Sequence, residues 1–364
     1  MTKLDINLPL THKLLLEGVE QGLHPGAQIY VSLKGEVVAD DGIVEARPEV
    51  PMNRDTINLW MSATKPITAV LFAQSWESGK LELDITVCEV IPGFASGGKS
   101  GITFRHLLTH TGGFRPEPDG LVGSKWAKAV SSVCSVALEE NWQPGERAGY
   151  HPATSWYILA EAIARIEDTS FQELAKQKVF DPLVMENSWI GVPVHQQKKY
   201  GESLGWMFRA NRFVRPDTAL NREEAIADVR PGGNGRGPIS ELGRFYEVLL
   251  GGGGDLLRPD TVARLTTRQR EGLYDHTFQH YLDWGFGFMV NSNRYGPITV
   301  PYSFGLHASE VTFGHGGSQS SAAFADPEHD LVVALVCNGM PGEPRHNKRT
   351  RDLNTAIYED LGLV

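Results

Sequence analysis

The sequence predicts an α/β (α+β) protein whose sheet is built from both ends of the chain, with a mostly helical region inserted between them. Residues 27–42 contain two β-rich runs, and residues 321–337 contain two more. Apolar residues at helical spacing dominate the middle of the chain, most clearly at 156–165 and 239–250. Strands at both ends and helices between them indicate one discontinuous sheet that carries an insertion.

The elements at the two ends are marked by their boundaries. Apolar residues at 14, 15 and 19 predict a first helix that stops at Gly22. Lys34 and Gly35 join the first two β-rich runs as a hairpin, and the turn-forming residues 326–330 separate the last two. A helical pattern from about 348 to 361 closes the chain. These elements account for both halves of the predicted sheet and for two of its covering helices.

The length of 364 residues fits two subdomains that share a cleft. We expect a discontinuous sheet subdomain, residues 1–85 and 285–364, and a mainly helical subdomain, residues 86–284. Clefts at such junctions are common ligand sites, so the active site is expected between the two.

Composition excludes several classes of function. The formal net charge of -10 offers no attraction to nucleic acid or to anionic lipid. No segment has the roughly 18 unbroken apolar residues of a membrane span, and Asp5 and Asn7 interrupt the apolar N-terminus before a signal peptide could form. The three cysteines fit neither a disulfide framework nor a zinc site. We expect a cytoplasmic protein, a monomer or homodimer, without cofactor or metal.

The strongest local signal for chemistry is Ser62-Ala63-Thr64-Lys65. A Ser and a Lys three positions apart on a helix project from the same face, so the amine can reach the hydroxyl. If Ser62 begins the helix, its own N–H also points at any oxyanion formed there. The pattern alone is also compatible with an ordinary helix start.

The residues that follow resemble the serine β-lactamase and penicillin-binding protein superfamily, most closely its class C-like carboxylesterases and transesterases. Beyond Ser62-x-x-Lys65, the resemblance rests on segments in the same order along most of the chain: RHLLTHTGG at 105–113, Tyr150, WGFG at 284–287, and GHGG at 314–317 ahead of FADP at 324–327. It implies an antiparallel sheet flanked by helices, with the helical subdomain inserted. It also implies an acyl-enzyme mechanism with Ser62 as the nucleophile.

By this resemblance Lys65 and Tyr150 handle the proton of Ser62. A phenol has an ordinary pKa near ~10 and a Lys amine near ~10.4, so either becomes a base at neutral pH only when its environment shifts it. A nearby cation favours phenolate, whereas burial favours a neutral amine. The sequence leaves open which of the two is the general base.

His315-Gly316-Gly317-Ser318 occupies the place of the third motif, usually Lys-Thr-Gly. The glycines would let a substrate approach the strand, and the N–H of Ser318 would be the second oxyanion donor. With an ordinary pKa of about 6.5, His315 would make the charge at this edge pH-dependent. Alternatively, His315 only caps a turn.

A second departure follows Tyr150, where the Tyr-x-Asn of the family is replaced by Tyr150-His151-Pro152. The missing amide donor would have held a substrate amide carbonyl. Together with the loss of the motif lysine, this makes esters or activated acyl groups the expected substrates, rather than β-lactams or D-alanyl peptides.

Other candidates carry weaker signals. His276 and His280 would share one face if their segment were helical, with Asp275 and Asp283 nearby, but no H-E-x-x-H arrangement is present and we expect no metal site. Trp284 and Phe286 are candidates for an acyl pocket, although alternating aromatic residues also occur in strand cores.

The sequence therefore predicts a serine acyl-enzyme hydrolase acting on esters, with a small-molecule acyl donor as its partner. An acyltransferase or transesterase that passes the acyl group to an amine or alcohol acceptor would use the same residues. A β-lactamase or D-alanyl peptidase, or a binding homologue that has lost catalysis, are further alternatives.

Overall fold

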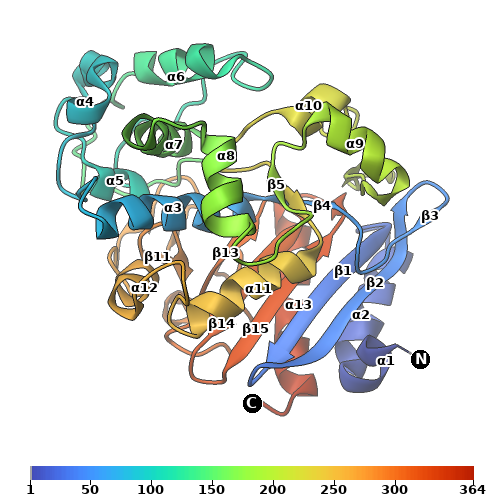
Figure 1. The fold of residues 1–364 in the computed structure, drawn as a ribbon. Helices are drawn as coiled ribbons and strands as arrows, with labels where there is room; N and C mark the ends of the chain where they lie inside the picture. Colours follow the sequence, from blue (N-terminus) through green and yellow to red (C-terminus); the bar gives the residue numbers. More distant parts are fainter. Residues whose placement is uncertain (1) are drawn as a thin grey trace.

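The computed structural model describes residues 2–364. Its largest element is an eight-stranded sheet with the order β11-β12-β13-β14-β15-β1-β2-β3, in which neighbouring strands run antiparallel (Figure 1). The strands are β1 (Gly26–Leu33), β2 (Glu36–Arg47), β3 (Val50–Pro51), β11 (Asp283–Trp284), β12 (Met289–Val290), β13 (Phe313–Gly317), β14 (Ser321–Asp326) and β15 (Leu331–Cys337). The pairing of β1 with β15, from Ala27 opposite Cys337 to Leu33 opposite Leu331, joins the two ends of the chain.

The hairpin between β1 and β2 turns where the sequence predicted. Lys34 and Gly35 form its two-residue loop and both have positive φ, 53° and 79°. Such a turn matches the twist of the flanking strands, and glycine adopts it without steric cost.

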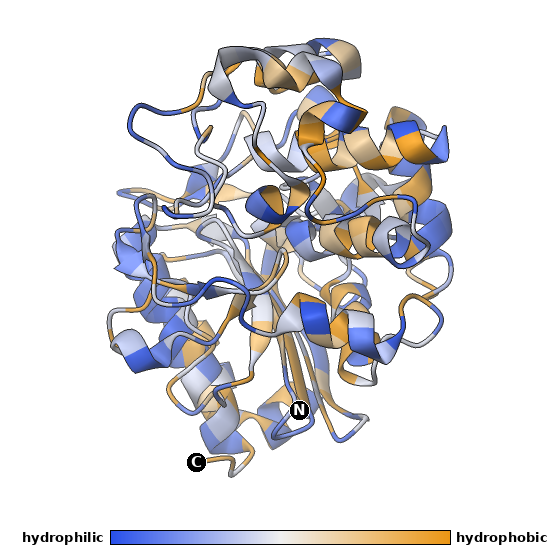
Figure 2. Ribbon diagram, turned by 90° about the vertical axis from the view of Figure 1, so that its left-hand side faces the viewer, coloured by the Kyte–Doolittle hydropathy of each residue, from blue (hydrophilic) through white to orange (hydrophobic). Residues whose placement is uncertain are grey.

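Both faces of the sheet are buried, because helices cover each side (Figure 2). In β15, residues 331, 333 and 335 pack with α1 (Lys3–Asn7), α2 (Pro9–Glu20) and α13 (Glu343–Asp360). The intervening residues 332, 334 and 336 pack with α11 (Ile239–Leu250) on the opposite face. Since successive strand side chains alternate between faces, a strand covered on both sides is apolar throughout, as LVVALVC is.

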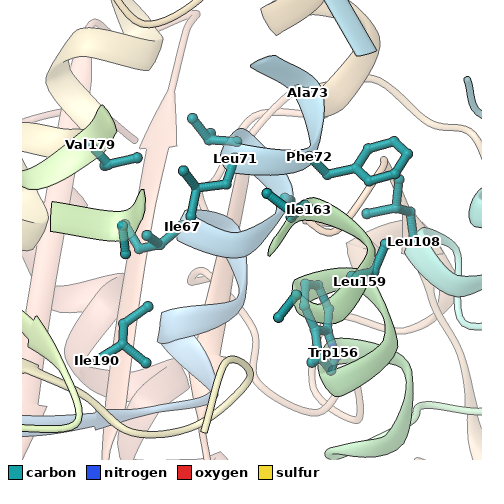
Figure 3. Packing of buried hydrophobic residues seen from close by; sticks show 14 of the residues in the cluster. Ile67, Leu71, Phe72, Ala73, Leu108, Trp156, Leu159, Ile163, Val179 and Ile190 are labelled. Carbon is teal, nitrogen blue, oxygen red and sulfur yellow. The ribbon is translucent and has the colours of Figure 1, made fainter. Parts of the chain in front are cut away.

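The inserted region is mostly helical and surrounds the long buried helix α3. Figure 3 shows side chains of α3 (Lys65–Glu77), including Ile67, Leu71 and Phe72, beside residues of α7 (Thr154–Glu167). The other helices of this part are α4 (Val87–Val90), α5 (Phe104–Leu108), α6 (Trp126–Ser135), α8 (Phe171–Ala175), α9 (Val194–Tyr200), α10 (Glu223–Ala227) and α12 (Pro259–Thr266). Because ten of the thirteen residues of α3 are buried, the position of its first turn is set by packing on all sides.

Three small sheets complete the fold. The first joins β4 (Asn58–Met61), β8 (Gly235–Gly237) and β5 (Trp189–Ile190) at the start of α3. The others are β16 (Gly339–Met340) with β6 (Phe208–Arg209) and β7 (Arg215–Pro216), and the pair β9 (Tyr274–Asp275) and β10 (His280–Tyr281).

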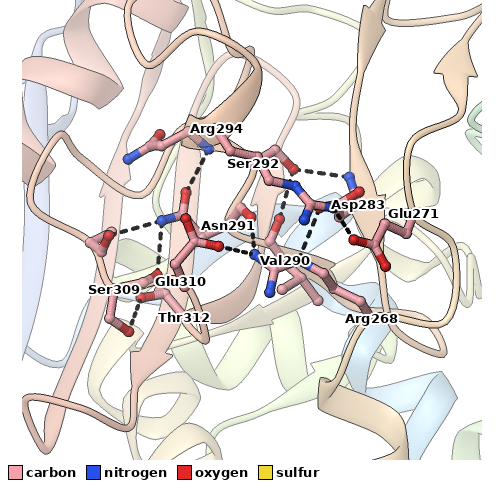
Figure 4. Close-up of polar contacts among 12 residues, drawn as sticks. Arg268, Glu271, Asp283, Val290, Asn291, Ser292, Arg294, Ser309, Glu310 and Thr312 are labelled. Carbon is pink, nitrogen blue, oxygen red and sulfur yellow. Dashed lines mark hydrogen bonds and ion pairs between the residues drawn. The ribbon is translucent and has the colours of Figure 1, made fainter.

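A polar cluster fastens the sheet edge at β11 (Figure 4). The buried carboxylate of Asp283 accepts from Arg268 at 3.0 Å and from Arg294 at 2.6 Å, and Tyr295 donates to it at 3.0 Å. Removing one member of a buried ion pair leaves an uncompensated charge, so this cluster holds the edge strand in one position.

The predicted fold class is confirmed, with differences in detail. The last helix begins at Glu343, five residues before the predicted start, with Pro344 in its first turn where proline is tolerated. His276 and His280 lie in a loop and in β10 and not on one helix. The division at 85/86 and 284/285 stays a prediction. Within residues 2–364, no helix is both long enough and apolar enough to span a membrane.

Candidate active site

Ser62 and Lys65 meet at the junction of β4 and α3. The chain leaves β4 at Met61, forms a 3₁₀ turn over Ser62–Thr64 and enters α3 at Lys65. In a 3₁₀ turn the side chains at i and i+3 eclipse one another, which aligns the amine with the hydroxyl. Lys65 Nζ lies 2.9 Å from Ser62 Oγ.

The turn that carries Ser62 has a strained backbone and is held in place by hydrogen bonds. Met61 has φ 50° and ψ -136°, a conformation that a side chain with a Cβ rarely adopts. Thr64 Oγ1 donates to the carbonyl of Met61 at 2.6 Å and accepts from the N–H of Gly235 at 2.8 Å. These bonds tie the start of α3 to β8, so the strained residue and the following Ser62 have little freedom.

Lys65 is fully buried without a carboxylate within salt-bridge distance in the described chain. Its amine donates to the carbonyl oxygens of Pro152 at 2.8 Å and Gly232 at 2.6 Å. Burial lowers the pKa of Lys65 well below its ordinary value, and the charge of Glu117 opposes this only in part. The site therefore favours the neutral amine.

The ring centre of Tyr150 lies 5.0 Å from Lys65 Nζ. Burial raises the pKa of the Tyr150 phenol above its ordinary value, and a hydrogen bond with the Ser62 side chain opposes the shift. The raised pKa therefore favours the protonated phenol beside Ser62 and the Lys65 amine.

Asp275 fixes the backbone around Tyr150, a role that the sequence did not reveal. Its Oδ1 accepts from the N–H groups of Tyr150, Thr277 and Phe278 at 2.9 to 3.1 Å, and its Oδ2 accepts from Arg270 at 3.0 Å. Thr277 also donates to the Tyr150 carbonyl at 2.9 Å. A carboxylate 125 residues from Tyr150 carries no sequence signal for this contact.

His315 on β13 is buried beside Tyr150, with their ring centres 6.0 Å apart. Its Nδ1 lies 2.6 Å from the carbonyl oxygen of Gly316, which can only accept, so Nδ1 carries the proton. Burial lowers the pKa of His315 to about 3. In contrast to the expectation from the sequence, this low pKa predicts no change of charge on His315 between pH 5 and 8, because desolvation outweighs the ordinary basicity of the ring.

The glycines of β13 allow the strand to pass close to the turn that carries Ser62. A Cβ on Gly317 would lie 2.4 Å from the carbonyl oxygen of Trp60 and 2.9 Å from the Met61 side chain. A Cβ on Gly316 would lie 2.4 Å from the ring of Tyr302. Ser318 follows the strand directly, and its side chain is exposed.

Two cavities open onto Ser62. The larger, of about 340 Å³, is lined by Ser62, Tyr150, Pro152, Thr277, Phe278, Met289, Pro301, Tyr302, His315, Gly316, Ser318, Glu343 and Asn347. The smaller, of about 130 Å³, is lined by Met61, Ser62, Glu117, Leu121, Val122, Pro152, Ala153, Tyr157, Arg230, Gly232, Gly233 and Ser318. If a carbonyl carbon lies at Ser62, the two groups bonded to it can therefore occupy separate cavities. A third, larger cavity at α6–α8 contains none of the predicted site residues.

Trp284 and Phe286 do not form the acyl pocket suggested by the sequence. Trp284 is buried behind the site, 5.8 Å from the Tyr150 ring and 5.5 Å from the His315 ring. Phe286 packs edge-on against Trp76 in the core. Their alternating spacing reflects core packing, and neither residue lines a cavity at Ser62.

His276 and His280 do not belong to a metal-ligand cluster. Among residues 2–364, no group of three His, Cys, Asp or Glu side chains is placed to hold a metal ion. The two acidic residues near them in the sequence, Asp275 and Asp283, form ion pairs with arginines.

Known proteins share this arrangement of sequence and fold. The family model described as Beta-lactamase matches residues 12–357. The chain belongs to the beta-lactamase family. Members of this family include serine hydrolases and acyltransferases, which fits a partly buried Ser62 beside the buried Lys65 amine.

Individual relatives of this beta-lactamase-family chain are distant. It is 23% identical to the Esterase/beta-lactamase LipL of Mycobacterium tuberculosis, over 86% of this chain and 77% of the relative. A penicillin-binding protein homologue from Caulobacter crescentus has a TM-score of 0.78 at 25% identity, with 97% of both chains covered. EstCE1, described as a hydrolase with promiscuous acyltransferase activity, has a TM-score of 0.81 at 19% identity, with 97% and 99% covered.

Proposed function

We propose that this protein is a serine esterase that forms an acyl-enzyme on Ser62, with neutral Lys65 as the general base. The supporting observation is the buried Lys65 amine, 2.9 Å from Ser62 Oγ. A neutral amine has two N–H groups and one lone pair. Because the carbonyls of Pro152 and Gly232 can only accept, they take the two N–H groups and leave the lone pair facing Ser62.

In this mechanism Ser62 Oγ bonds to the ester carbonyl carbon while its proton passes to Lys65. The C–O bond to the alcohol then breaks, and the protonated Tyr150 gives its proton to the departing oxygen and recovers one from Lys65. Water attacks the acyl-enzyme in the second half-reaction, with the same groups acting in reverse. The raised pKa of Tyr150 favours the role of proton donor over that of the resting base.

The backbone N–H groups of Ser62 and Ser318 are the proposed oxyanion donors. No hydrogen bond from either group to another residue occurs in the described chain, and both residues line both cavities. Donors that are already oriented stabilise the charge that develops on the carbonyl oxygen without reorganisation.

Esters are proposed as substrates, ahead of β-lactams, because of the charges around the larger cavity. No Lys or Arg is among its lining residues, His315 is neutral, and Glu343 contributes a carboxylate. The carboxylate of a β-lactam would meet no permanent cation there, and it would face a like charge. Losing one hydrogen bond to a charged group costs on the order of 1.5 to 3 kcal/mol, about tenfold to a hundredfold in rate.

Acyl transfer is the second candidate, and the two cavities favour it. An alcohol that occupies the larger cavity after the first product leaves would be positioned to attack the acyl-enzyme. A product assay with candidate alcohols and amines separates transfer from hydrolysis.

The test of the proposed function is a comparison of kcat/KM on p-nitrophenyl butyrate and on a chromogenic cephalosporin, with Ser62→Ala as the control. We expect the ester to be turned over at least tenfold more efficiently. A higher value on the cephalosporin would reject the esterase proposal in favour of β-lactamase activity.

A further inference from the structure

We infer that the larger cavity binds an ammonium-bearing alcohol, so that the preferred substrates are esters of cationic amino alcohols. This inference rests on the proposed esterase function. The cavity is lined by the carboxylate of Glu343 and by aromatic rings, and its described lining residues include no Lys or Arg.

The alcohol portion is assigned to this cavity because Tyr150 lines it and does not line the smaller one. If Tyr150 protonates the departing oxygen, that oxygen and the alcohol must lie on its side of Ser62. The acyl group then enters the smaller cavity of about 130 Å³, which suits a short chain.

Glu343 supplies the charge that selects a cation. It is the first residue of α13, its side chain is exposed, and its two carboxylate oxygens accept from the Tyr302 hydroxyl at 2.9 and 3.1 Å. One hydroxyl leaves carboxylate lone pairs open to a ligand. Two arginines of the same helix are engaged elsewhere. Arg345 donates to the Ala210 and Asn211 carbonyls, and Arg349 donates to the Gln319 and Gly339 carbonyls.

Aromatic rings supply the rest of the cation site. The ring centre of Phe278 lies 4.8 Å from that of Tyr150 and 5.7 Å from that of Tyr302, and all three residues line the cavity. Ring faces attract ammonium groups, most strongly quaternary ones, because of the negative potential above the ring. A carboxylate beside aromatic rings therefore favours a substituted ammonium over a neutral or anionic group.

The test compares butyrylcholine with 3,3-dimethylbutyl butyrate, in which an uncharged carbon replaces the quaternary nitrogen. We expect kcat/KM for the choline ester to exceed that for the neutral ester by about tenfold, the effect of one cation–π and carboxylate contact. Glu343→Gln should reduce this ratio to about threefold or less. Glu117→Gln is the matched control, because this carboxylate lines the smaller cavity and should leave the ratio unchanged.

A second measurement needs no variant: choline should inhibit hydrolysis of the neutral ester more strongly than 3,3-dimethylbutanol does. The inference would be overturned if the ratio of kcat/KM for the choline ester to that for the neutral ester were near one in the unmodified protein, or were the same in Glu343→Gln as in the unmodified protein. Either result would leave the esterase proposal intact. Failure to hydrolyse even the neutral ester would overturn the esterase proposal, and this inference with it.

Discussion

The carbonyl oxygen of Gly232 accepts a 2.6 Å hydrogen bond from Lys65, although 167 positions separate the two residues in the chain. Gly232 can come this close because it has no side chain: a Cβ there would lie 2.7 Å from the ring of the buried Trp156. The Lys65 amine is thus positioned by a backbone group whose location depends on a glycine.

Gly232→Ala should therefore displace this carbonyl and misalign Lys65. We expect kcat/KM on p-nitrophenyl butyrate to fall by about 10- to 100-fold, the range that small misplacements of catalytic groups cost. Gly101→Ala is the control, since a Cβ there meets nothing within 4 Å and Gly101 lines neither cavity at Ser62, so this variant should retain activity within about twofold. Equal losses in both variants would argue against a positioning role for the Gly232 carbonyl.

Ser62→Ala should abolish turnover without unfolding the protein, because it removes the covalent acceptor and Ser62 is only partly buried. Lys65→Ala and Tyr150→Phe should each reduce kcat by about 10³-fold or more, and the double variant by far less than the product, since the two act as one unit. Steady-state kinetics and circular dichroism give both readouts. Strictly additive losses would show that Lys65 and Tyr150 act independently and would contradict this prediction.

The rate should rise with pH as Lys65 loses its proton, because the neutral amine is the proposed base and its pKa lies well below the ordinary value. His315, with a pKa lowered to about 3, should not contribute between pH 5 and 8. His315→Gln is thus expected to preserve the shape of the kcat/KM profile over this range. Loss of an inflection near pH 6 to 7 in that variant would show that His315 titrates in the active protein.

Buried neutral histidines should make the fold acid-sensitive. The pKa values of His24, His151 and His315 are lowered to about 3, first of all by burial. Below about pH 6.5 these histidines bind protons in the unfolded chain but stay neutral in the folded chain. Their contribution to the free energy of unfolding is therefore complete above about pH 6.5 and is lost as the pH falls toward 3. Each of the three rings should lower the free energy of unfolding by about 2 kcal/mol at pH 5 relative to pH 7.

Urea midpoints at the two pH values measure this loss. His315→Gln should make the decline shallower, whereas His195→Gln, at an exposed position on α9, should not. A midpoint that does not change with pH would contradict the assignment of buried neutral rings.

Local patterns predicted the parts of this molecule that depend on nearby residues. The hairpin at Lys34 and Gly35, the apolar strand β15 and the Ser62–Lys65 pair follow from turn chemistry, double-sided burial and helical spacing. The predicted family and fold are likewise confirmed.

Contacts between distant segments were not predictable in this way. The Gly232 carbonyl on Lys65, and Asp275 beneath Tyr150, depend on the folded path of the chain. The neutral state of His315 depends on its burial, and the core positions of Trp284 and Phe286 depend on which face of the sheet edge meets the helices. None of these leaves a local pattern in the sequence.

The most direct test of the central claim is the mass of the protein quenched during turnover of p-nitrophenyl butyrate. We predict a butyryl adduct that peptide mapping assigns to Ser62, that disappears as substrate is exhausted, and that is absent from Ser62→Ala. Turnover by the unmodified protein with no covalent adduct under rapid quench, or an adduct on another residue, would contradict an acyl-enzyme mechanism at Ser62.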